Sequence, residues 1–264
     1  MNVDLLIKLV LISLAVCSAV MMIVWLWAYK IKNAGVVDIF WAFNFTIIAT
    51  ILWFLSDGYE SRKNIICLMA ATWSARLGTY LLIRVGTHLQ EEEGRYKQLR
   101  KEWAPNSNLK FFFFFQMQAM SNVFLSIPFF ITVINPDQNI SALEYIGVGI
   151  WTIAIIGEAT ADWQLKKFKN NPTNKGKVCQ YGLWNYSRHP NYFFESMIWV
   201  GYFIFALSSP YGWIAIICPL SILYLILKVT GIPMTEEQSL RSKGDAFREY
   251  QRTTSVFIPW FKKK

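Results

Sequence analysis

The sequence predicts an all-α integral membrane protein with seven transmembrane helices, and three observations lead to that prediction. First, 54% of its 264 residues are hydrophobic and 17% are aromatic, which is too apolar for an ordinary soluble domain. Second, several apolar runs approach the roughly 20 residues that a helix needs to cross a bilayer. Third, the net charge of +9 lies between these runs. That placement is typical of the cytoplasmic loops of membrane proteins and argues against nucleic-acid binding.

Apolar runs of this length must be helices, because only helices and closed barrels satisfy their backbone hydrogen bonds in lipid. The first run is too long for the core of a signal peptide, so we expect it to be a retained span. The predicted spans are 4–29, 36–55, 64–85, 111–134, 142–164, 191–208 and 211–230.

Lysine and arginine predict the orientation of these spans. One side receives the basic clusters Arg84–Lys110 and Lys166–Arg188 together with the C-terminal tail. The other side receives only Lys8, Arg62 and Lys63. Because positive charge is retained in the cytoplasm, we expect the N-terminus outside and the C-terminus in the cytoplasm.

Ionisable side chains inside the predicted spans indicate a polar cavity that opens to the cytoplasm. Such groups are expensive in lipid, so they normally face the interior of the helix bundle and mark function. Asp38 lies near the start of the second span, and Arg76 lies well inside the third. In the fifth span, Glu158 and Asp162 share one helix face at i,i+4 spacing. The alternative for any single residue is a structural ion pair, for example of Arg76 with Glu158 or Asp162.

The stretch Gly182–Glu195, which reads GLWNYSRHPNYFFE, predicts an anion site. Proline is favoured at the first helical position, so a helix is expected to begin at Pro190. A helix N-terminus offers free N–H groups and a partial positive charge, to which Arg188 and His189 would add, and phosphate is the simplest ligand. Glu195 lies about one turn further in and is expected to have a partner or ligand. The alternative is a basic membrane-interface anchor.

The cytoplasmic segments around this motif allow two interpretations. Lys169, Lys175 and Lys177 either bind phosphates or act only as topology signals. Loop 86–110 has mixed charge and is expected to be a solvated helix or lid.

The C-terminal segment is expected to close the structure. Residues 235–252 are expected to form a polar, amphipathic helix outside the membrane, in which Glu237 and Arg241 can pair at i,i+4 spacing. We expect segment 235–260 to pack on a single transmembrane domain that covers 1–264. The alternative is a surface helix held by anionic lipid.

Missing motifs exclude several classes of protein. The chain has no GxGxxG, GxxxxGK[ST], HExxH or GxSxG motif. Its four cysteines form no CxxC pair, and its two histidines are far apart. Neither a disulfide framework nor a metal site is therefore expected.

Several motifs together resemble a known family. GLWNYSRHPNYFFE, ADWQLKKFK with NKGKV after it, and EEQSLRSKGDAFREYQRTTSVFIP resemble the steroid 5-alpha-reductase-like integral membrane family, in its bacterial DUF1295 group. VVDIFWAFNF and TWSARLGTYLL also resemble it, so the likeness runs from about residue 35 to 260 in the family's order. Similar RHPxYxG and EE…Y…IP patterns occur in integral-membrane methyltransferases and in sterol C14-reductases.

The resemblance implies a multi-pass enzyme of the bacterial inner membrane that binds NADPH at the cytoplasmic ends of its helices. It implies hydride transfer to the β-carbon of an activated C=C bond in a lipophilic enone, such as a 3-oxo-Δ4 steroid, while an acid polarises the carbonyl. Carried over by motif, the residues expected to hold the cofactor are Arg76, Asp162, Lys169, Arg188, His189, Asn191, Tyr192, Glu195, Glu236, Glu237, Arg241 and Tyr250.

The chain departs from the family pattern in three places. It lacks the Gln-Glu pair that binds the substrate carbonyl in the animal enzymes, and Asp38 is expected to replace it. Trp73 stands where those enzymes have a tyrosine, which leaves Tyr80 as the expected proton donor. Phe194 stands where the family has a glycine, which either narrows the site or changes the helix packing.

Two function classes remain open after this comparison. NADPH carries a pyrophosphate and a 2′-phosphate and therefore needs arginine and lysine side chains. The basic loops, with Asn191 and Glu195, favour an NADPH-dependent reductase. The alternative is an S-adenosylmethionine-dependent methyltransferase of a membrane lipid or prenyl-cysteine, whose methyl donor carries no phosphate. A lipid carrier is a third interpretation, but the chain lacks the repeat symmetry of many transporters. For either enzyme the partners are a lipophilic small molecule and the bilayer.

Overall fold

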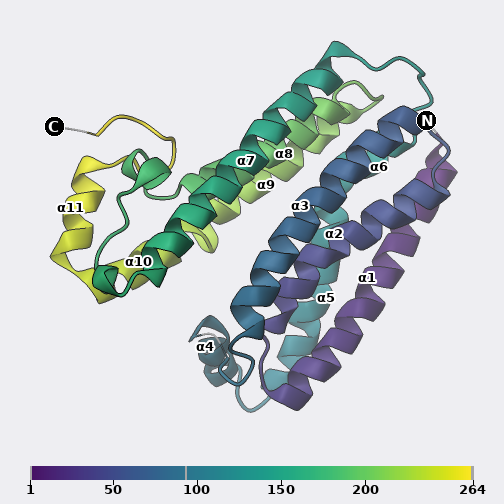
Figure 1. Ribbon diagram of the computed structural model, residues 1–264. Helices are drawn as coiled ribbons and strands as arrows, with labels where there is room; N and C mark the ends of the chain where they lie inside the picture. The colour runs from purple at the N-terminus through teal and green to yellow at the C-terminus, as the bar shows by residue number, and fades with distance from the viewer. Residues whose placement is uncertain (1, 93, 263–264) are drawn as a thin grey trace. The chain divides into compact units, whose positions relative to one another are not determined.

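A computed structural model of the chain describes residues 2–92 and 94–262. Within these residues the secondary structure is helical, apart from an isolated bridge between Ser187 and Ser255 (Figure 1). The all-α class is therefore confirmed. The chain divides into two compact units: unit 1 is Met1–Ile140 with Ser209–Gly212, and unit 2 is Ser141–Ser208 with Trp213–Lys264.

Unit 1 is a bundle of long apolar helices. α2 packs along α3, and α1 packs along α5 and α2 (Figure 1). α5 and α6 are bent by 44° relative to each other, where Pro128 opens α6 and interrupts the helical hydrogen bonds. The helices are α1 (Val3–Ile31), α2 (Val36–Leu55), α3 (Glu60–Gly86), α4 (Gly94–Glu102), α5 (Ser107–Leu125) and α6 (Ile127–Val133).

A buried network of neutral polar groups joins three helices of unit 1. Asn44 of α2 donates to Asn122 of α5 (2.9 Å), and both side chains are fully buried. Asn122 in turn donates to the backbone oxygen of Trp41 (2.9 Å). On α3, the hydroxyl of Ser74 donates to the backbone oxygen of Ala42 (2.5 Å). Such side-chain hydrogen bonds hold apolar helices together where water is excluded.

A buried arginine near the start of α3 binds the loop that follows α6. Arg62 is 1% exposed and donates to the backbone oxygens of Asn135 (3.3 Å), Asp137 and Asn139 (2.6 Å). A Cβ added to Gly58 would lie 2.2 Å from the backbone oxygen of Val133, so only glycine fits the turn between α2 and α3. This arginine satisfies carbonyl groups of the 134–140 loop, a role that charge counting along the sequence does not reveal.

Unit 2 is built on the pair α7 and α8. Ser141 and Glu144 form a capping box at the start of α7. Gly147 and Gly201 let the two helices approach closely: a Cβ on Gly147 would lie 2.8 Å from the backbone oxygen of Gly201. The elements are α7 (Ala142–Asn170), η1 (Pro172–Asn174), η2 (Gly182–Asn185), α8 (Pro190–Ala206), η3 (Gly212–Ile216), α9 (Ile217–Tyr224), a π-turn η4 (Leu225–Val229), α10 (Ile232–Lys243) and α11 (Asp245–Thr253).

The number of candidate membrane spans is smaller than the sequence predicts. By length and composition, five described helices can cross a membrane, and the bent pair α5–α6 would make a sixth. α8, which corresponds to the predicted span 191–208, has 17 residues and lies at the short end of the range of roughly 17–25 for a spanning helix. The polar segment 235–252 is also not one helix, because it breaks at Gly244, where φ is +52°.

Candidate functional site

The first turn of α8 presents its N–H groups next to basic side chains. α8 begins at Pro190, as the sequence predicts. Phe193 makes the first N–H bond of the helix, to the backbone oxygen of His189 (3.1 Å). The N–H groups of Asn191 and Tyr192 precede it, so they belong to the turn in which backbone donors have no acceptor inside the helix.

A buried charged cluster lies beside this turn, and Glu236 of α10 is its centre. Arg188 Nε donates to Glu236 Oε1 (2.7 Å), and His189 Nε2 lies 3.1 Å from the same oxygen. Gln251 Nε2 donates to Oε2 (2.7 Å). The exposed fractions of the Arg188, His189 and Glu236 side chains are 10%, 4% and 14%. We call Arg188, His189, Glu236 and Gln251 the Glu236 cluster.

The C-terminal tail completes the surroundings of Arg188. Its Nη1 donates to the backbone oxygens of Gln251 (2.9 Å) and Thr254 (2.7 Å). Its backbone N–H donates to the oxygen of Ser255 (2.9 Å), and the hydroxyl of Ser187 donates to the oxygen of Phe257 (2.7 Å). Within unit 2, the tail is therefore fastened to the residues just before α8; the packing of segment 235–260 on a single domain 1–264 stays a prediction.

Tyr250 of α11 also binds the loop that precedes α8. Its hydroxyl donates to the backbone oxygens of Trp184 and Ser187, the second at 3.1 Å. Burial raises the pKa of Tyr250 well above its ordinary value, so the hydroxyl remains a donor. The predicted contact of Tyr250 with a cofactor stays a prediction.

Polar residues of α7 and α8 meet near the start of α8. Asn191 Nδ2 donates to Asp162 Oδ1 (3.4 Å), which brings together two residues that the motifs predicted for one site. Asn191 Oδ1 is buried and has no hydrogen-bond partner among the described residues. Glu158, one turn before Asp162 on α7, is 5% exposed. Glu195 accepts a hydrogen bond from Trp199 Nε1 (2.9 Å). Glu195 therefore has a partner, as the sequence predicts for a carboxylate in a membrane helix.

Tyr192 links the starts of α8 and α10. Its hydroxyl lies 3.2 Å from Thr235 Oγ1, and its ring stacks on His189 with centroids 5.5 Å apart and planes inclined by 6°. His189 and Tyr192 therefore lie together, and His189 contacts Glu236; their predicted place in one cofactor site stays a prediction.

Other predicted cofactor residues are exposed and are not part of the Glu236 cluster. Glu237 and Arg241 form the predicted i,i+4 pair, with 63% and 78% of their side chains exposed. Lys169 is exposed near the end of α7. Burial raises the pKa of the Cys179 thiol, and the nearby Lys243 and Lys169 act in the opposite direction. The two lysines therefore lie within electrostatic reach of one thiol.

In unit 1, Asp38 pairs with a residue that the sequence did not single out. Tyr96 of α4 is fully buried, and its hydroxyl donates to Asp38 Oδ1 (2.7 Å). Glu92, 8% exposed, accepts from the backbone N–H of Ala34 (2.8 Å) and from Arg100 Nη2 (2.7 Å). Much of segment 86–110 is exposed, but these contacts fix its centre to the turn before α2.

The predicted residues of α3 lie on one face. Arg76 and Tyr80 are both half-buried and one turn apart. Trp73 is fully buried, and its ring meets the ring of Phe45 edge-on (5.1 Å). It is part of the packed interior of unit 1.

Comparison with known proteins assigns the family. The profile of a family described as "Protein of unknown function (DUF1295)" matches residues 24–254. The chain belongs to the DUF1295 family. An uncharacterized protein of Schizosaccharomyces pombe is 25% identical to this DUF1295 protein over 270 residues, covering 89% of this chain and 75% of that one. No solved structure matches it. The matched residues include the Glu236 cluster and the Asp38–Tyr96 pair.

Sequence reasoning missed several partners in this DUF1295 protein. Gln251 and Tyr96 complete the hydrogen bonds of Glu236 and Asp38. Gln251 lies in the quoted C-terminal motif but has no predicted role there, and Tyr96 lies outside the quoted motifs. Glu92 and Arg100 lie at i,i+8 spacing in a segment of mixed charge, so no short-range pattern pairs them. Within residues 2–92 and 94–262, no group of three or more His, Cys, Asp and Glu is arranged to hold a metal.

Proposed function

We propose that this DUF1295 protein is an NADPH-dependent reductase of an activated C=C bond in a lipophilic enone. The observation that carries the proposal is the Glu236 cluster, because it sets an arginine, a histidine and free first-turn N–H groups at the start of α8. The motif that builds this arrangement is the one that resembles steroid 5-alpha-reductases. NADPH, when bound, supplies a hydride for the β-carbon of the enone.

The residues of unit 2 fit a phosphate-bearing cofactor by donor type. The first turn of α8 offers backbone N–H groups, and Lys169 and Lys243 add two positive charges. The unpartnered Asn191 Oδ1 suits a hydroxyl or amide donor of the cofactor. Asp162 orients that amide through Nδ2.

In this proposal Arg188 has a structural role as well as a phosphate-binding one. Its Nε and Nη1 bind Glu236 and backbone oxygens of the tail, which leaves Nη2 for a phosphate. Its main role is then to hold the tail and the start of α8 in place. His189 and Gln251 keep the Glu236 carboxylate fixed for that purpose.

In unit 1, Asp38 remains the proposed acid. Its Oδ1 accepts the hydrogen bond of the Tyr96 hydroxyl, so in this proposal the proton offered to the substrate is carried by Asp38 itself, on Oδ2. We propose that this pair polarises the substrate carbonyl. Tyr80 is the proposed proton donor to the α-carbon.

One observation favours the second candidate, an S-adenosylmethionine-dependent methyltransferase of a membrane lipid or prenyl-cysteine. Because Arg188 is largely bound by protein acceptors, less of its charge is available for phosphates than the motif alone suggests. A methyl donor without phosphate needs no such charge.

A thermal-shift experiment on the detergent-purified protein separates the two candidates. A ligand that binds only the folded state raises the unfolding temperature by mass action. We expect NADPH to stabilise the protein, NADH to do so less, and S-adenosylmethionine to have no effect. Stabilisation by S-adenosylmethionine alone would replace the reductase with the methyltransferase. If neither NADPH nor S-adenosylmethionine stabilises the protein, both candidate functions are rejected.

A matched pair of lysine variants then tests the phosphate contacts. Lys169→Gln is expected to weaken NADPH binding about two- to fivefold, the scale of an exposed charge pair. Lys166→Gln removes an exposed charge from the same helix and is expected to leave NADPH affinity unchanged. Equal affinities in the two variants would remove Lys169 from the site.

We also propose the seven-span topology, with α8 as the sixth span and the C-terminus in the cytoplasm. The four native cysteines are buried, so an introduced cysteine can be labelled selectively. A membrane-impermeant maleimide is expected to label Gln138→Cys in intact cells and Lys175→Cys only after permeabilisation. The reverse pattern would invert the topology, and labelling of both in intact cells would remove one span.

A further inference from the structure

The C-terminal tail, residues 254–262, runs along the loop before α8 and is held there by both backbone and side chains. The ring of Phe257 meets the ring of Phe193, in the first turn of α8, edge-on at 5.7 Å. Further along, the backbone N–H of Trp260 donates to the backbone oxygen of Tyr186 (2.9 Å). These contacts fix the course of the tail as far as its last aromatic residues.

Beside these contacts, the tail leaves large apolar side chains exposed. Trp260 is 68% exposed and Phe261 is 75% exposed. The ring of Phe261 lies edge-on to the ring of Tyr186 (6.2 Å), so tail and loop contribute to one surface. Clustered apolar side chains of this kind mark sites of interaction. We call this the tail surface; its residues are Tyr181, Tyr186, Ile258, Trp260, Phe261 and Lys262.

The loop that carries the tail surface lies beside the end of the apolar part of α7. Within this loop, Trp184 Nε1 donates to the backbone oxygen of Ala161 (2.9 Å). α7 is a candidate membrane span. Trp163, two residues beyond Ala161, is exposed, and Lys167 Nζ lies 4.9 Å from the centre of its ring. Tryptophan and lysine at the end of a span are typical of the membrane–water interface, so the loop lies at the level of that interface.

The two stretches that build the tail surface, 163–188 and 254–262, are basic and contain no acidic residue. Lys262 Nζ donates to Gln180 Oε1 (2.6 Å), which places this charge beside the loop. Asp162, just before the first stretch, is half-buried and accepts a hydrogen bond within unit 2. The lysines of the first stretch are Lys166, Lys167, Lys169, Lys175 and Lys177.

The acidic side chains of α10 and α11 do not offset this charge. Glu236 binds Arg188 and His189. Each of the other carboxylates pairs with an arginine of its own helix, Glu237 with Arg241, Asp245 with Arg248, and Glu249 with Arg252. These acids are thus compensated by basic partners of their own, and the lysine charge of the loop and the tail remains.

We propose that the tail surface docks on the anionic lipid head groups of the bilayer beside α7. Trp260 and Phe261 insert at the level of the head groups, and Lys262 meets lipid phosphates. Two observations select this occupant: the exposed aromatic side chains lie where α7 leaves the bilayer, and the surrounding segments are basic without acids. Because the tail is already fixed by its contacts with the loop, docking orders few further groups. None of the tail-surface residues belongs to the proposed cofactor site, so the proposal stands independently of the reductase.

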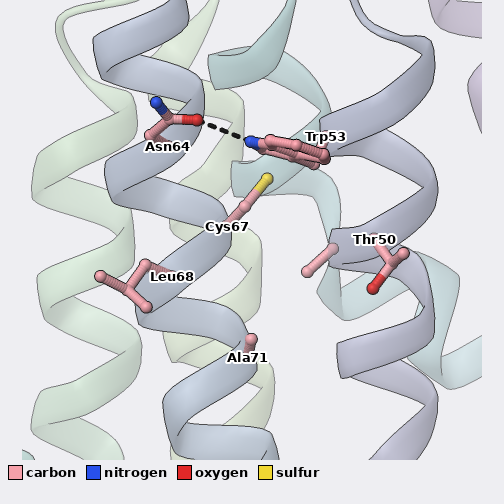
Figure 2. Close-up of a pocket in the computed structure, with 7 residues that line it drawn as sticks. Thr50, Trp53, Asn64, Cys67, Leu68 and Ala71 are labelled. Carbon is pink, nitrogen blue, oxygen red and sulfur yellow. Dashed lines mark hydrogen bonds between the residues drawn. The ribbon is translucent and has the colours of Figure 1, made fainter.

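Two other positions provide references for depth in the membrane. Leu68 of α3 is exposed and lines a mostly apolar groove between α2 and α3, which are both candidate membrane spans (Figure 2). It provides the hydrocarbon reference. Thr173 is exposed in the loop beyond the end of α7 and provides the aqueous reference. The four native cysteines are buried, so cysteines introduced at exposed positions can be labelled selectively.

Fluorescence quenching in nanodiscs that hold one copy of the protein tests the docking. A nitrobenzoxadiazole label on Ile258→Cys is quenched with acrylamide, a neutral reagent in the water. With phosphatidylglycerol in the nanodisc we expect shielding close to that of Leu68→Cys, and in pure phosphatidylcholine exposure close to that of Thr173→Cys. High salt should reverse the shielding. Equal shielding in the two lipids would overturn the proposal, because the surface would then be covered without regard to lipid charge. Equal exposure in both would also overturn it.

A matched pair of lysine variants tests the charge. In phosphatidylglycerol nanodiscs, Lys262→Gln is expected to lower the ratio of docked to undocked tail about fivefold, the effect of one lysine near an anionic surface. Lys97→Gln removes an exposed charge from α4 and is expected to leave that ratio unchanged. Equal ratios in the two variants would remove Lys262 from the docking surface and overturn the proposal.

A second pair tests the aromatic side chains. Trp260→Ser combined with Phe261→Ser is expected to expose the label on Ile258→Cys in phosphatidylglycerol nanodiscs. Trp213→Ser removes a tryptophan that is 65% exposed beyond the end of α8, and it is expected to leave the label shielded. Phe261→Ser alone gives the same test if the double variant does not fold. Continued shielding in a folded variant of the tail would overturn the proposal.

Discussion

The two units bury their polar side chains in different ways. In unit 1, Asn44 and Asn122 form a neutral network inside the helices, with both side chains fully buried. In unit 2, the Glu236 cluster is charged, lies at helix ends and retains 10% exposure at Arg188. The neutral network joins helices that already pack together. The charged cluster joins segments that are separated by 48 and 15 residues along the chain.

This difference predicts unequal effects of mutation. Removing one member of a neutral pair leaves an unsatisfied amide, which costs about 1–3 kcal/mol. Removing one member of a buried ion pair leaves an uncompensated charge, which costs about 3–5 kcal/mol. The charged cluster should therefore be the more sensitive of the two, although it is the less deeply buried.

The largest effect is expected from Glu236→Ala. The substitution leaves Arg188 without a carboxylate and should lower the free energy of unfolding by about 3 kcal/mol. Equilibrium unfolding in detergent micelles measures it. Glu237→Ala, at the neighbouring position, removes only an exposed i,i+4 pair and should change stability by less than about 0.5 kcal/mol. Equal effects of the two substitutions would end the distinction between the cluster and a surface ion pair.

The next largest loss of stability is expected from a change in packing, not in charge, between α7 and α8 of unit 2. Gly157 of α7 faces Phe194: an added Cβ would lie 2.5 Å from its ring. The absence of a side chain at Gly157 therefore supplies the space that the ring of Phe194 fills. Gly157→Ala is expected to destabilise the protein by about 2 kcal/mol through overpacking. Combining it with Phe194→Gly should relieve most of that loss in a double-mutant cycle, whereas additive effects would show that the two residues do not compensate.

The same comparison shows how far sequence reasoning reaches. The helix start at Pro190 depends on local backbone chemistry, so the sequence predicted it. The i,i+4 pair of Glu237 and Arg241 is equally local. The partners of Arg188 are not: Glu236, Gln251 and Thr254 are distant in the chain, and only the folded unit brings them together.

The span count and the C-terminal segment show that local sequence patterns can also leave two structures open. Hydropathy alone predicts seven spans, but α8 has 17 residues, and composition cannot decide whether so short a helix crosses the bilayer. The segment 235–252 has one amphipathic pattern, yet Gly244 at φ +52° turns the chain and separates α10 from α11. A glycine inside a helical pattern is compatible with either outcome, so the sequence left the break unseen.

A smaller effect is expected in the neutral network. Asn122→Leu removes the acceptor of Asn44 and the donor to Trp41, and should lower the free energy of unfolding by about 1–2 kcal/mol. The same micelle unfolding experiment measures it, with Gln118→Leu, one turn earlier on α5, as the control for adding an apolar side chain. A loss as large as that of Glu236→Ala would mean that charge is not what makes the cluster sensitive.

The smallest effect at neutral pH, and the one with a pH signature, is expected from Tyr250→Phe. The substitution removes the hydroxyl that donates to Trp184 and Ser187 and should lower the free energy of unfolding by about 1 kcal/mol at pH 7. Because burial raises the pKa of Tyr250 in the folded protein, the neutral hydroxyl stabilises the fold fully below the unfolded pKa of about 10. That contribution is lost as the pH rises from there toward the folded pKa.

The wild-type protein should therefore lose stability above about pH 10 more steeply than Tyr250→Phe, and the two stability curves should converge at alkaline pH. Tyr181→Phe provides the control, because this tyrosine is 56% exposed and its removal should leave the alkaline slope of the wild type in place. Parallel curves for the wild type and Tyr250→Phe would mean that the hydroxyl is solvated in both the folded and unfolded states. The loop before α8 would then owe its position to the Glu236 cluster and to the hydrogen bonds of Ser187 and Arg188 with the tail, rather than to the hydroxyl of Tyr250.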